Sequence, residues 1–147
     1  MAKLIVVRGL PGSGKSTYIQ ENYPGATPAA FAPDDWSPVV VSADHTFMNF
    51  ATGHYTFAPH QLEAAHKRAL ALATKAMTNN VSEVLVDNVH ALRQDWADIL
   101  AVADERGYEV VVVDLFDGGL SDEELATRNM HSVPQATIAK MRAQWEA

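Results

Sequence analysis

Short apolar runs alternate along the chain with longer segments whose apolar residues recur at every third or fourth position. The apolar runs predict four strands, over residues 3–8, 39–42, 84–86 and 109–115. The helical spacing predicts helices over residues 15–22, from 59 onward, over 92–106, over 121–129 and from 134 onward. Strands that alternate with helices predict a three-layer α/β fold, in which helices cover both faces of a mostly parallel sheet of four or five strands.

Three segments interrupt this alternation. Residues 24–38 contain four prolines, which exclude a long regular element and predict a loop. Residues 46–58 are aromatic and irregular, with a turn expected at Gly53. The pair Gly118–Gly119 is expected to act as a hinge for a short helical lid over about residues 118–133. The valine-rich run over 109–115 is suited to burial on both faces of the sheet.

Composition narrows the class of protein. A chain of 147 residues with 48% hydrophobic content has the length and character of one folded domain, residues 1–147. Its net charge of −7 would repel nucleic acid, so nucleic-acid contact needs a local basic patch. The absence of cysteine excludes disulfides and thiolate sites. The apolar start is too short for a signal peptide and no stretch has the length of a membrane span, so we expect a cytoplasmic protein without membrane contact.

The most specific motif follows the first strand, where residues 9–17 match the phosphate-binding pattern G-x-x-x-x-G-K-S/T at every required position. In this pattern the loop turns its N–H groups toward phosphate oxygens, Lys15 reaches the β- and γ-phosphates, and Ser16 holds Mg²⁺. The following helix also directs its positive end at the anion. The motif therefore predicts a site for ATP and Mg²⁺ formed by Gly9, Gly12, Ser13, Gly14, Lys15, Ser16 and Thr17.

Two carboxylates follow predicted strands, at the edge of the sheet where such folds bind ligands. Asp44 is expected to be the catalytic base that accepts the proton of an acceptor hydroxyl. Asp87 is expected either to hold Mg²⁺ together with Ser16 or to orient the acceptor, and the sequence leaves both roles open. The adjacent residues His45 and Asn88 are expected to contact the acceptor.

A kinase also needs a mobile cation that balances charge on the transferred phosphoryl group. Arg128 in the predicted lid is the leading catalytic candidate, ahead of Lys140 and Arg142. The aromatic residues after Asp44 have two interpretations, either stacking on a base or closing a loop onto the core. We favour the core because aromatic side chains chiefly supply buried area; the residues concerned are Phe47, Phe50, Tyr55 and Phe57.

Together these motifs resemble the small P-loop kinases related to the kinase domain of phage polynucleotide kinase, often described as AAA-type ATP-binding proteins. The matching segments are 8–17, 41–45, 55–57, 62–66, 86–88 and 128–129 with 133–134. The resemblance implies a kinase-type P-loop fold, with nucleotide phosphates and Mg²⁺ at Lys15 and Ser16. It also implies that Asp44 activates a 5′-hydroxyl, that Asp87 faces the acceptor, and that Arg128 lies in the region of the lid arginine.

Position 47 departs from the pattern of that family, which has an arginine there to grip the 3′-phosphate of the acceptor. This chain has Phe47, and its insert over 24–38 is longer than expected. We expect a kinase that transfers the γ-phosphoryl group of ATP to a hydroxyl, with a polynucleotide or nucleoside 5′-hydroxyl as the favoured acceptor. Two alternatives stay open: a zeta-toxin-like kinase for a small molecule or sugar nucleotide, which Phe47 favours, and a nucleotide-binding switch that has no acceptor.

Overall fold

A five-stranded parallel sheet forms the centre of the computed structural model, which describes residues 2–129 and 131–147. The strand order is β2 (Thr27–Pro28), β3 (Val39–Val41), β6 (Glu83–Asn88), β1 (Lys3–Gly9) and β7 (Glu109–Phe116). β1 lies inside the sheet, and its apolar residues from Leu4 to Val7 are fully buried. The predicted α/β fold with a mostly parallel sheet is confirmed, and a two-residue strand is added within the proline-rich segment.

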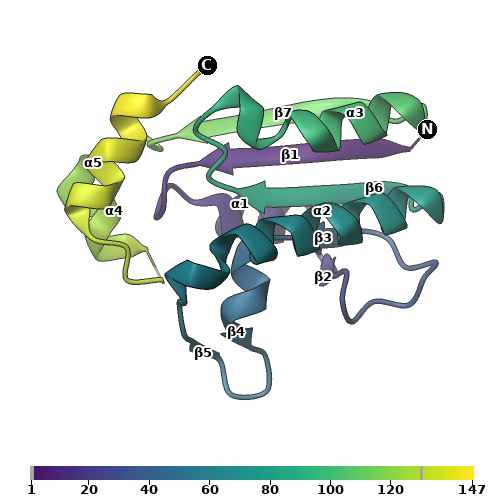
Figure 1. Ribbon diagram of the computed structural model, residues 1–147, viewed down its shortest axis with the longest axis horizontal. Helices are drawn as coiled ribbons and strands as arrows, with labels where there is room; N and C mark the ends of the chain where they lie inside the picture. Colours follow the sequence, from purple (N-terminus) through teal and green to yellow (C-terminus); the bar gives the residue numbers. More distant parts are fainter. Residues whose placement is uncertain (1, 130) are drawn as a thin grey trace.

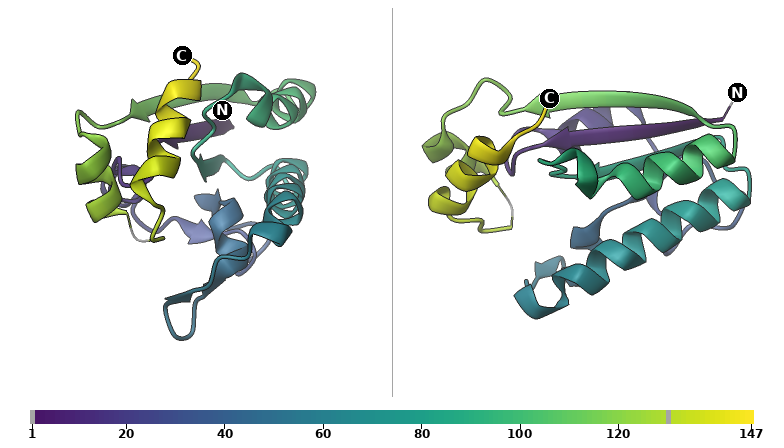
Figure 2. Two further views of the ribbon diagram at one scale, coloured as in Figure 1. Left: turned by 60° about the vertical axis from the view of Figure 1, so that its left-hand side comes forward. Right: turned by 45° about the horizontal axis from the view of Figure 1, so that its top comes forward.

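Helices cover both faces of the sheet, as Figures 1 and 2 show. They are α1 (Lys15–Asn22), α2 (Leu62–Thr78) and α3 (Ala97–Glu105). α2 and α3 run side by side over one face, where they bury Leu4 and Val6, and α1 packs Ile19 against Ile5 and Val7 on the other. Because strand side chains alternate between faces, the single apolar run of β1 contributes to both halves of the core.

The remaining elements gather near the carboxyl ends of the strands, toward which β1 and β6 point in Figure 1. They are the 3₁₀ helices η1 (Ala43–Phe47), η2 (Pro59–Gln61) and η3 (Arg93–Asp95), the projecting hairpin of β4 (Met48–Asn49) and β5 (His54–Tyr55), and the lid helices α4 (Asp122–Arg128) and α5 (Gln135–Gln144). A capping box between Ser121 and Glu124 starts α4. In the described part of the chain, no helix combines the length and the apolar character needed to cross a membrane.

The valine-rich strand β7 lies at an edge of the sheet, so its predicted burial on both faces is wrong. Val110 and Val112 are 38% and 45% exposed, whereas Val111 and Val113 are partly buried in the layer that contains α1. A run of valines indicates a strand but not its position in the sheet, because edge and central strands use the same β-branched residues.

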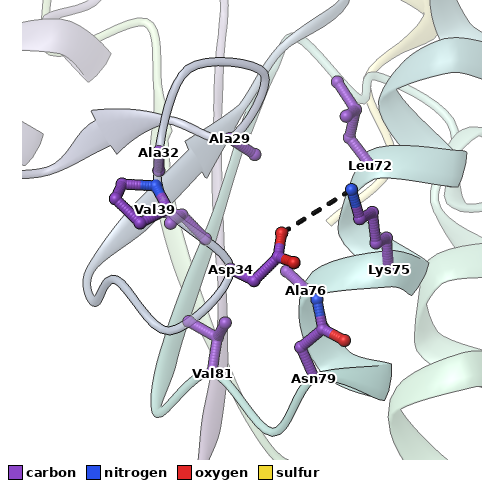
Figure 3. A pocket seen from close by; sticks show the side chains of 10 residues that line it. Ala29, Ala32, Asp34, Val39, Leu72, Lys75, Ala76, Asn79 and Val81 are labelled. Atoms are coloured by element: carbon purple, nitrogen blue, oxygen red, sulfur yellow. Dashed lines mark ion pairs between the residues drawn. The ribbon is translucent and has the colours of Figure 1, made fainter.

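Residues 29–34 of the proline-rich segment lie beside the C-terminal half of α2 (Figure 3). The Asp34 carboxylate lies 3.7 Å from Lys75 Nζ, and the two segments line a partly open cavity of about 30 Å³. A cavity of this size has room for a water molecule or two. It is lined by Val39 and Val81, which lie at or just before the amino ends of β3 and β6. This part of the segment therefore packs at the amino ends of β3 and β6, while Phe31 packs on the ring of Phe50.

Arg8, near the carboxyl end of β1, is a buried cation that joins distant parts of the chain, with only 1% of its surface exposed. Its guanidinium lies 3.2 Å from an oxygen of Asp114 on β7. Two tryptophan rings flank it, with centroids 5.2 Å (Trp96) and 4.1 Å (Trp145) from the guanidinium carbon. It also donates hydrogen bonds to the backbone carbonyl oxygens of His90, Ala91 and Glu146. Arg8 thereby ties the C-terminal residues to the sheet immediately before the phosphate loop.

Candidate functional site

The phosphate loop between β1 and α1 lies directly against the lid. A Cβ atom on Gly12 would lie 2.6 Å from the carbonyl oxygen of Leu125 in α4, and the φ angle of Gly12 is +81°. A Cβ atom on Gly118 would similarly lie 2.7 Å from the carbonyl oxygen of Ser13. Only glycine fits such positions, because a positive φ disfavours other residues and a backbone carbonyl group cannot move to make room for a Cβ atom. The loop and the lid therefore share one packed interface.

The groups that this loop presents fit the phosphates of a nucleotide. Gly14 is the N-cap residue of α1 and provides no side-chain hydrogen bond, which leaves the N–H groups of the first turn available to an anion. Ser13 Oγ is buried and has no hydrogen-bond partner among the described residues. Lys15 Nζ donates to the carbonyl oxygens of Gly9 and Leu10 at 2.8 and 3.3 Å, so its ammonium group is held inside the loop.

Lys15 and the two predicted carboxylates form one electrostatic cluster. Burial lowers the pKa of Lys15, while the charges of Asp87 and Asp44 favour its protonated form. Burial raises the pKa of Asp87; the positive charge of Lys15 opposes that increase, and the negative charge of Asp44 adds to it. The carboxyl ends of β1, β3 and β6 thus bring together side chains that are far apart in the sequence.

The predicted magnesium ligands are of the right chemical type. Ser16 and Thr17 are exposed in the first turn of α1, and Asp87 is half-buried at the end of β6. Mg²⁺ prefers oxygen ligands and is commonly held by one or two protein groups together with the phosphates of a substrate. The hydroxyl of Ser16 and the carboxylate of Asp87 would supply such ligands beside a bound nucleotide.

Asp44 lies in η1 directly after β3, and 43% of its side chain is exposed. Ser42 Oγ accepts a hydrogen bond from the N–H of Asp44 at 3.2 Å, and Asn88 Oδ1 accepts one from the N–H of Ala43 at 3.0 Å. These two side chains satisfy the first N–H groups of η1, as caps do, and so fix the position of the carboxylate. Asn88 therefore braces η1 here, and its contact with an acceptor stays a prediction.

Two side chains from other segments meet the Asp44 carboxylate. The hydroxyl of Tyr55 in β5 donates to Asp44 Oδ1 at 2.8 Å, and Nε2 of His131 in the lid lies 3.6 Å from Oδ2. The rings of Tyr55 and His131 pack together with their centroids 4.1 Å apart. Burial, the charge of Asp44 and this hydrogen bond raise the pKa of the Tyr55 hydroxyl far above its ordinary value, so the hydroxyl keeps its proton.

The predicted lid cations take different positions. Arg128 is exposed in the last turn of α4, and its side chain makes no hydrogen bond or ion pair with the described residues. Arg142 is bound 2.6 Å from Asp117 and 2.7 Å from Asp122, so it fixes α5 to the start of the lid. Lys140 is exposed on α5. Among the described residues, Arg128 and Lys140 therefore both lack a bound partner, and Arg142 is excluded as a mobile cation.

The aromatic residues after Asp44 divide into a buried and an exposed group. Phe47 is 5% exposed and packs against the rings of Tyr55 and Phe57, which confirms its predicted core role. The same prediction is wrong for Phe50 and Phe57, which are 45% and 47% exposed. The ring of Phe50 contacts the His45 ring at 5.4 Å between centroids. Burial lowers the pKa of His45, which favours its neutral ring. A surface of aromatic rings therefore lies next to Asp44.

Sequence reasoning missed His131 and did not connect Tyr55 with Asp44. The available signal was weak, since one histidine in a predicted lid and one tyrosine in an aromatic loop are both common features. Their convergence on Asp44 depends on the tertiary placement of two loops, which no local pattern encodes.

Comparisons with known proteins agree with this architecture. A family model described as an AAA domain matches residues 4–147. Human NEDD4-binding protein 2 is 29% identical over 142 residues, which cover 94% of this chain and 7% of that protein. A solved structure described as "Structure of Pnkp1/Rnl/Hen1 complex" superposes with a TM-score of 0.56 and 25% identity, over 86% of this chain and 38% of that chain. The chain therefore spans well under half the length of both relatives.

Proposed function

The chain belongs to the AAA domain family, and on that premise we propose that it is a kinase that transfers the γ-phosphoryl group of ATP to a hydroxyl acceptor. The observation that carries the proposal is the position of Asp44. Its half-exposed carboxylate lies in the same electrostatic cluster as the phosphate-loop residue Lys15. Enzymes that transfer phosphoryl groups act mainly by positioning and charge stabilisation, together with one residue that orients the nucleophile.

In this proposal the loop and Lys15 hold the phosphates, while Ser16 and Asp87 hold Mg²⁺, which when bound would neutralise phosphate charge. Asp44 accepts the proton of the acceptor hydroxyl as its oxygen forms a bond to the γ-phosphorus. The bond between that phosphorus and the β–γ bridging oxygen breaks, and ADP leaves. Asp44 then returns the proton to solvent. Arg128 is proposed to approach the transferred group from the lid.

A polynucleotide or nucleoside 5′-hydroxyl is the favoured acceptor because exposed aromatic rings lie beside Asp44, the proposed catalytic base. Phe50 and His45 are in contact with each other, and Phe31 packs on Phe50 with ring centroids 5.0 Å apart. Such rings stack on nucleobases without regard to sequence. The buried ring of Phe47 offers no cation to a 3′-phosphate. A small-molecule or sugar-nucleotide acceptor is therefore the second candidate.

The proposal is tested with γ-labelled ATP and a panel of 5′-hydroxyl DNA, RNA, nucleosides and sugars. We expect label on one class of acceptor, and we expect Asp44→Asn to reduce the transfer by about 10²- to 10⁴-fold, as for loss of a general base. ATP binding should persist in this variant. Asp104→Asn is the matched control, because Asp104 is exposed on α3 away from the loop. Nucleotide binding with no labelled product across the panel would favour a switch, and full transfer by Asp44→Asn would refute the role of the base.

A further inference from the structure

Both oxygens of the Asp44 carboxylate face a neighbouring side chain. Tyr55 donates a hydrogen bond to Oδ1 at 2.8 Å, and His131 Nε2 lies 3.6 Å from Oδ2. A separation of 3.6 Å is too short for a water molecule to lie between the two atoms, since each hydrogen bond of such a water spans about 2.8 Å. A substrate hydroxyl that approaches Oδ2 from the side of the lid must therefore displace the imidazole, whereas the exposed part of the carboxylate faces solvent.

The lid holds His131 in this position through Asn129. Asn129 Oδ1 accepts hydrogen bonds from the N–H groups of His131 at 3.2 Å and of Val133 at 2.8 Å. Its Nδ2 atom donates to the carbonyl oxygens of Ala126 at 2.9 Å and of Val133 at 3.2 Å. Because α4 also packs on Gly12, the position of His131 is tied to that of the phosphate loop.

The surroundings of the imidazole favour a contact with the carboxylates. His131 packs on Tyr55, and it lies near the carboxylates of both Asp44 and Asp87. The side chain is 29% exposed, so solvent and substrate can reach it from one side. His131 is thus the lid side chain that touches the proposed base, whereas Arg128 does not.

We propose that His131 covers the lid side of Asp44 Oδ2, from which the attacking hydroxyl approaches, until an acceptor displaces its imidazole, so that this histidine sets the preference of the kinase for its acceptor over water. The inference rests on the proposed function, because it takes Asp44 as the base. Without the His131 imidazole at Oδ2, a water molecule would give its proton to Asp44 and attack the γ-phosphorus. The bond to the bridging oxygen would break, with ADP and phosphate as the products and no acceptor phosphorylated.

The experiment compares the wild type with His131→Asn in two assays that use the same γ-labelled ATP. One assay measures phosphate release without acceptor, and the other measures transfer to an acceptor at saturating concentration. We expect His131→Asn to raise acceptor-free hydrolysis about tenfold, which corresponds to a barrier lowered by about 1.4 kcal/mol. Transfer at saturation should change less than twofold. His66→Asn is the control, because His66 is exposed on α2.

Two further variants test the route of the reaction. The double variant His131→Asn/Asp44→Asn should return hydrolysis to the wild-type level or below, because the added hydrolysis depends on Asp44. Tyr55→Phe removes the hydrogen bond to Oδ1 but keeps the ring that packs on His131. Because the imidazole stays at Oδ2, this variant should raise hydrolysis by less than His131→Asn does. Protection of each variant by ATP in thermal unfolding reports whether the nucleotide site is intact.

The outcomes separate the inference from the proposed function. If the wild type binds ATP and transfers its label, while His131→Asn hydrolyses ATP no faster, the proposed role of His131 is refuted and the proposed kinase activity is not. If the wild type neither binds nor hydrolyses ATP, both ideas fall. An increase in hydrolysis that survives the double variant would also overturn the inference, because that hydrolysis would not pass through Asp44.

Discussion

Replacing Arg8 with methionine is expected to destabilise the fold strongly while leaving the shape of the side chain nearly intact. Methionine matches the aliphatic stem of arginine but removes every donor. The variant therefore loses the ion pair with Asp114 and the hydrogen bonds to the carbonyl oxygens of His90, Ala91 and Glu146. Asp114 has 36% of its side chain exposed, so water can solvate its carboxylate in the variant. Loss of the ion pair therefore changes the free energy of unfolding little.

The cost comes mainly from the two acceptors that stay buried, since His90 and Ala91 are only 4% and 7% exposed. A buried acceptor that loses its partner costs about 1–3 kcal/mol. Each lost contact with a tryptophan ring adds about 0.5–1 kcal/mol, which the methionine sulfur partly restores. The total is about 3–5 kcal/mol. For a chain of this size, that lowers the melting temperature by about 6–20 °C.

The assay is thermal unfolding followed by circular dichroism at neutral pH without nucleotide, with urea unfolding as the second measure of free energy. Arg8→Lys should fall between the wild type and Arg8→Met, because lysine keeps the charge but not the planar set of donors. Arg106→Met is the surface control, since Arg106 is exposed at the end of α3. A decrease of less than about 3 °C for Arg8→Met would refute the weight given to the buried acceptors.

Two other substitutions test the loop and the region of η3. Gly12→Ala should weaken ATP binding about tenfold, because its Cβ would lie 2.6 Å from the Leu125 carbonyl oxygen; Gly25→Ala shares the positive φ without close neighbours, and titration calorimetry showing equal loss in both would contradict this reason. Burial lowers the pKa of His90 to about 3, so the unfolded chain binds the extra proton first and stability falls as the pH drops below about 6.5. His90→Asn suits the φ of 50° and removes the titration, so between pH 7 and pH 5 it should lose about 2 kcal/mol less stability than the wild type in urea unfolding. Equal losses would show that His90 does not titrate in this way.

The parts of the site that are local in sequence were predictable, and the parts that depend on loop placement were not. The phosphate loop is a contiguous motif whose spacing follows from its chemistry, and the relationship to small P-loop kinases is confirmed on that basis. Asp44 and Asp87 were found because parallel strands end at one edge, which is a rule of topology. His131 obeys no such rule, since its position depends on how Asn129 turns the chain after α4.

The errors in the predicted fold have similar causes. The pattern of β7 predicted a strand correctly. Its position at the edge of the sheet, with β1 as its one neighbour, depends on how the other strands are arranged. The environment of Arg8 was also invisible, because a single arginine at the end of an apolar run is expected to reach solvent. It is buried because Trp96, Trp145 and the C-terminal backbone enclose it, and these groups come from three separate segments.

The contact between loop and lid also bears on how related sequences are recognised. The phosphate-binding pattern requires glycine at positions 9 and 14 but leaves position 12 free. Here Leu125 in the lid excludes any side chain at Gly12, and Ser13 in the loop does the same at Gly118. Two glycines more than a hundred positions apart thus depend on one interface between the loop and the lid. A search template that demands both should collect chains that share this lid and pass over phosphate-loop proteins that lack it.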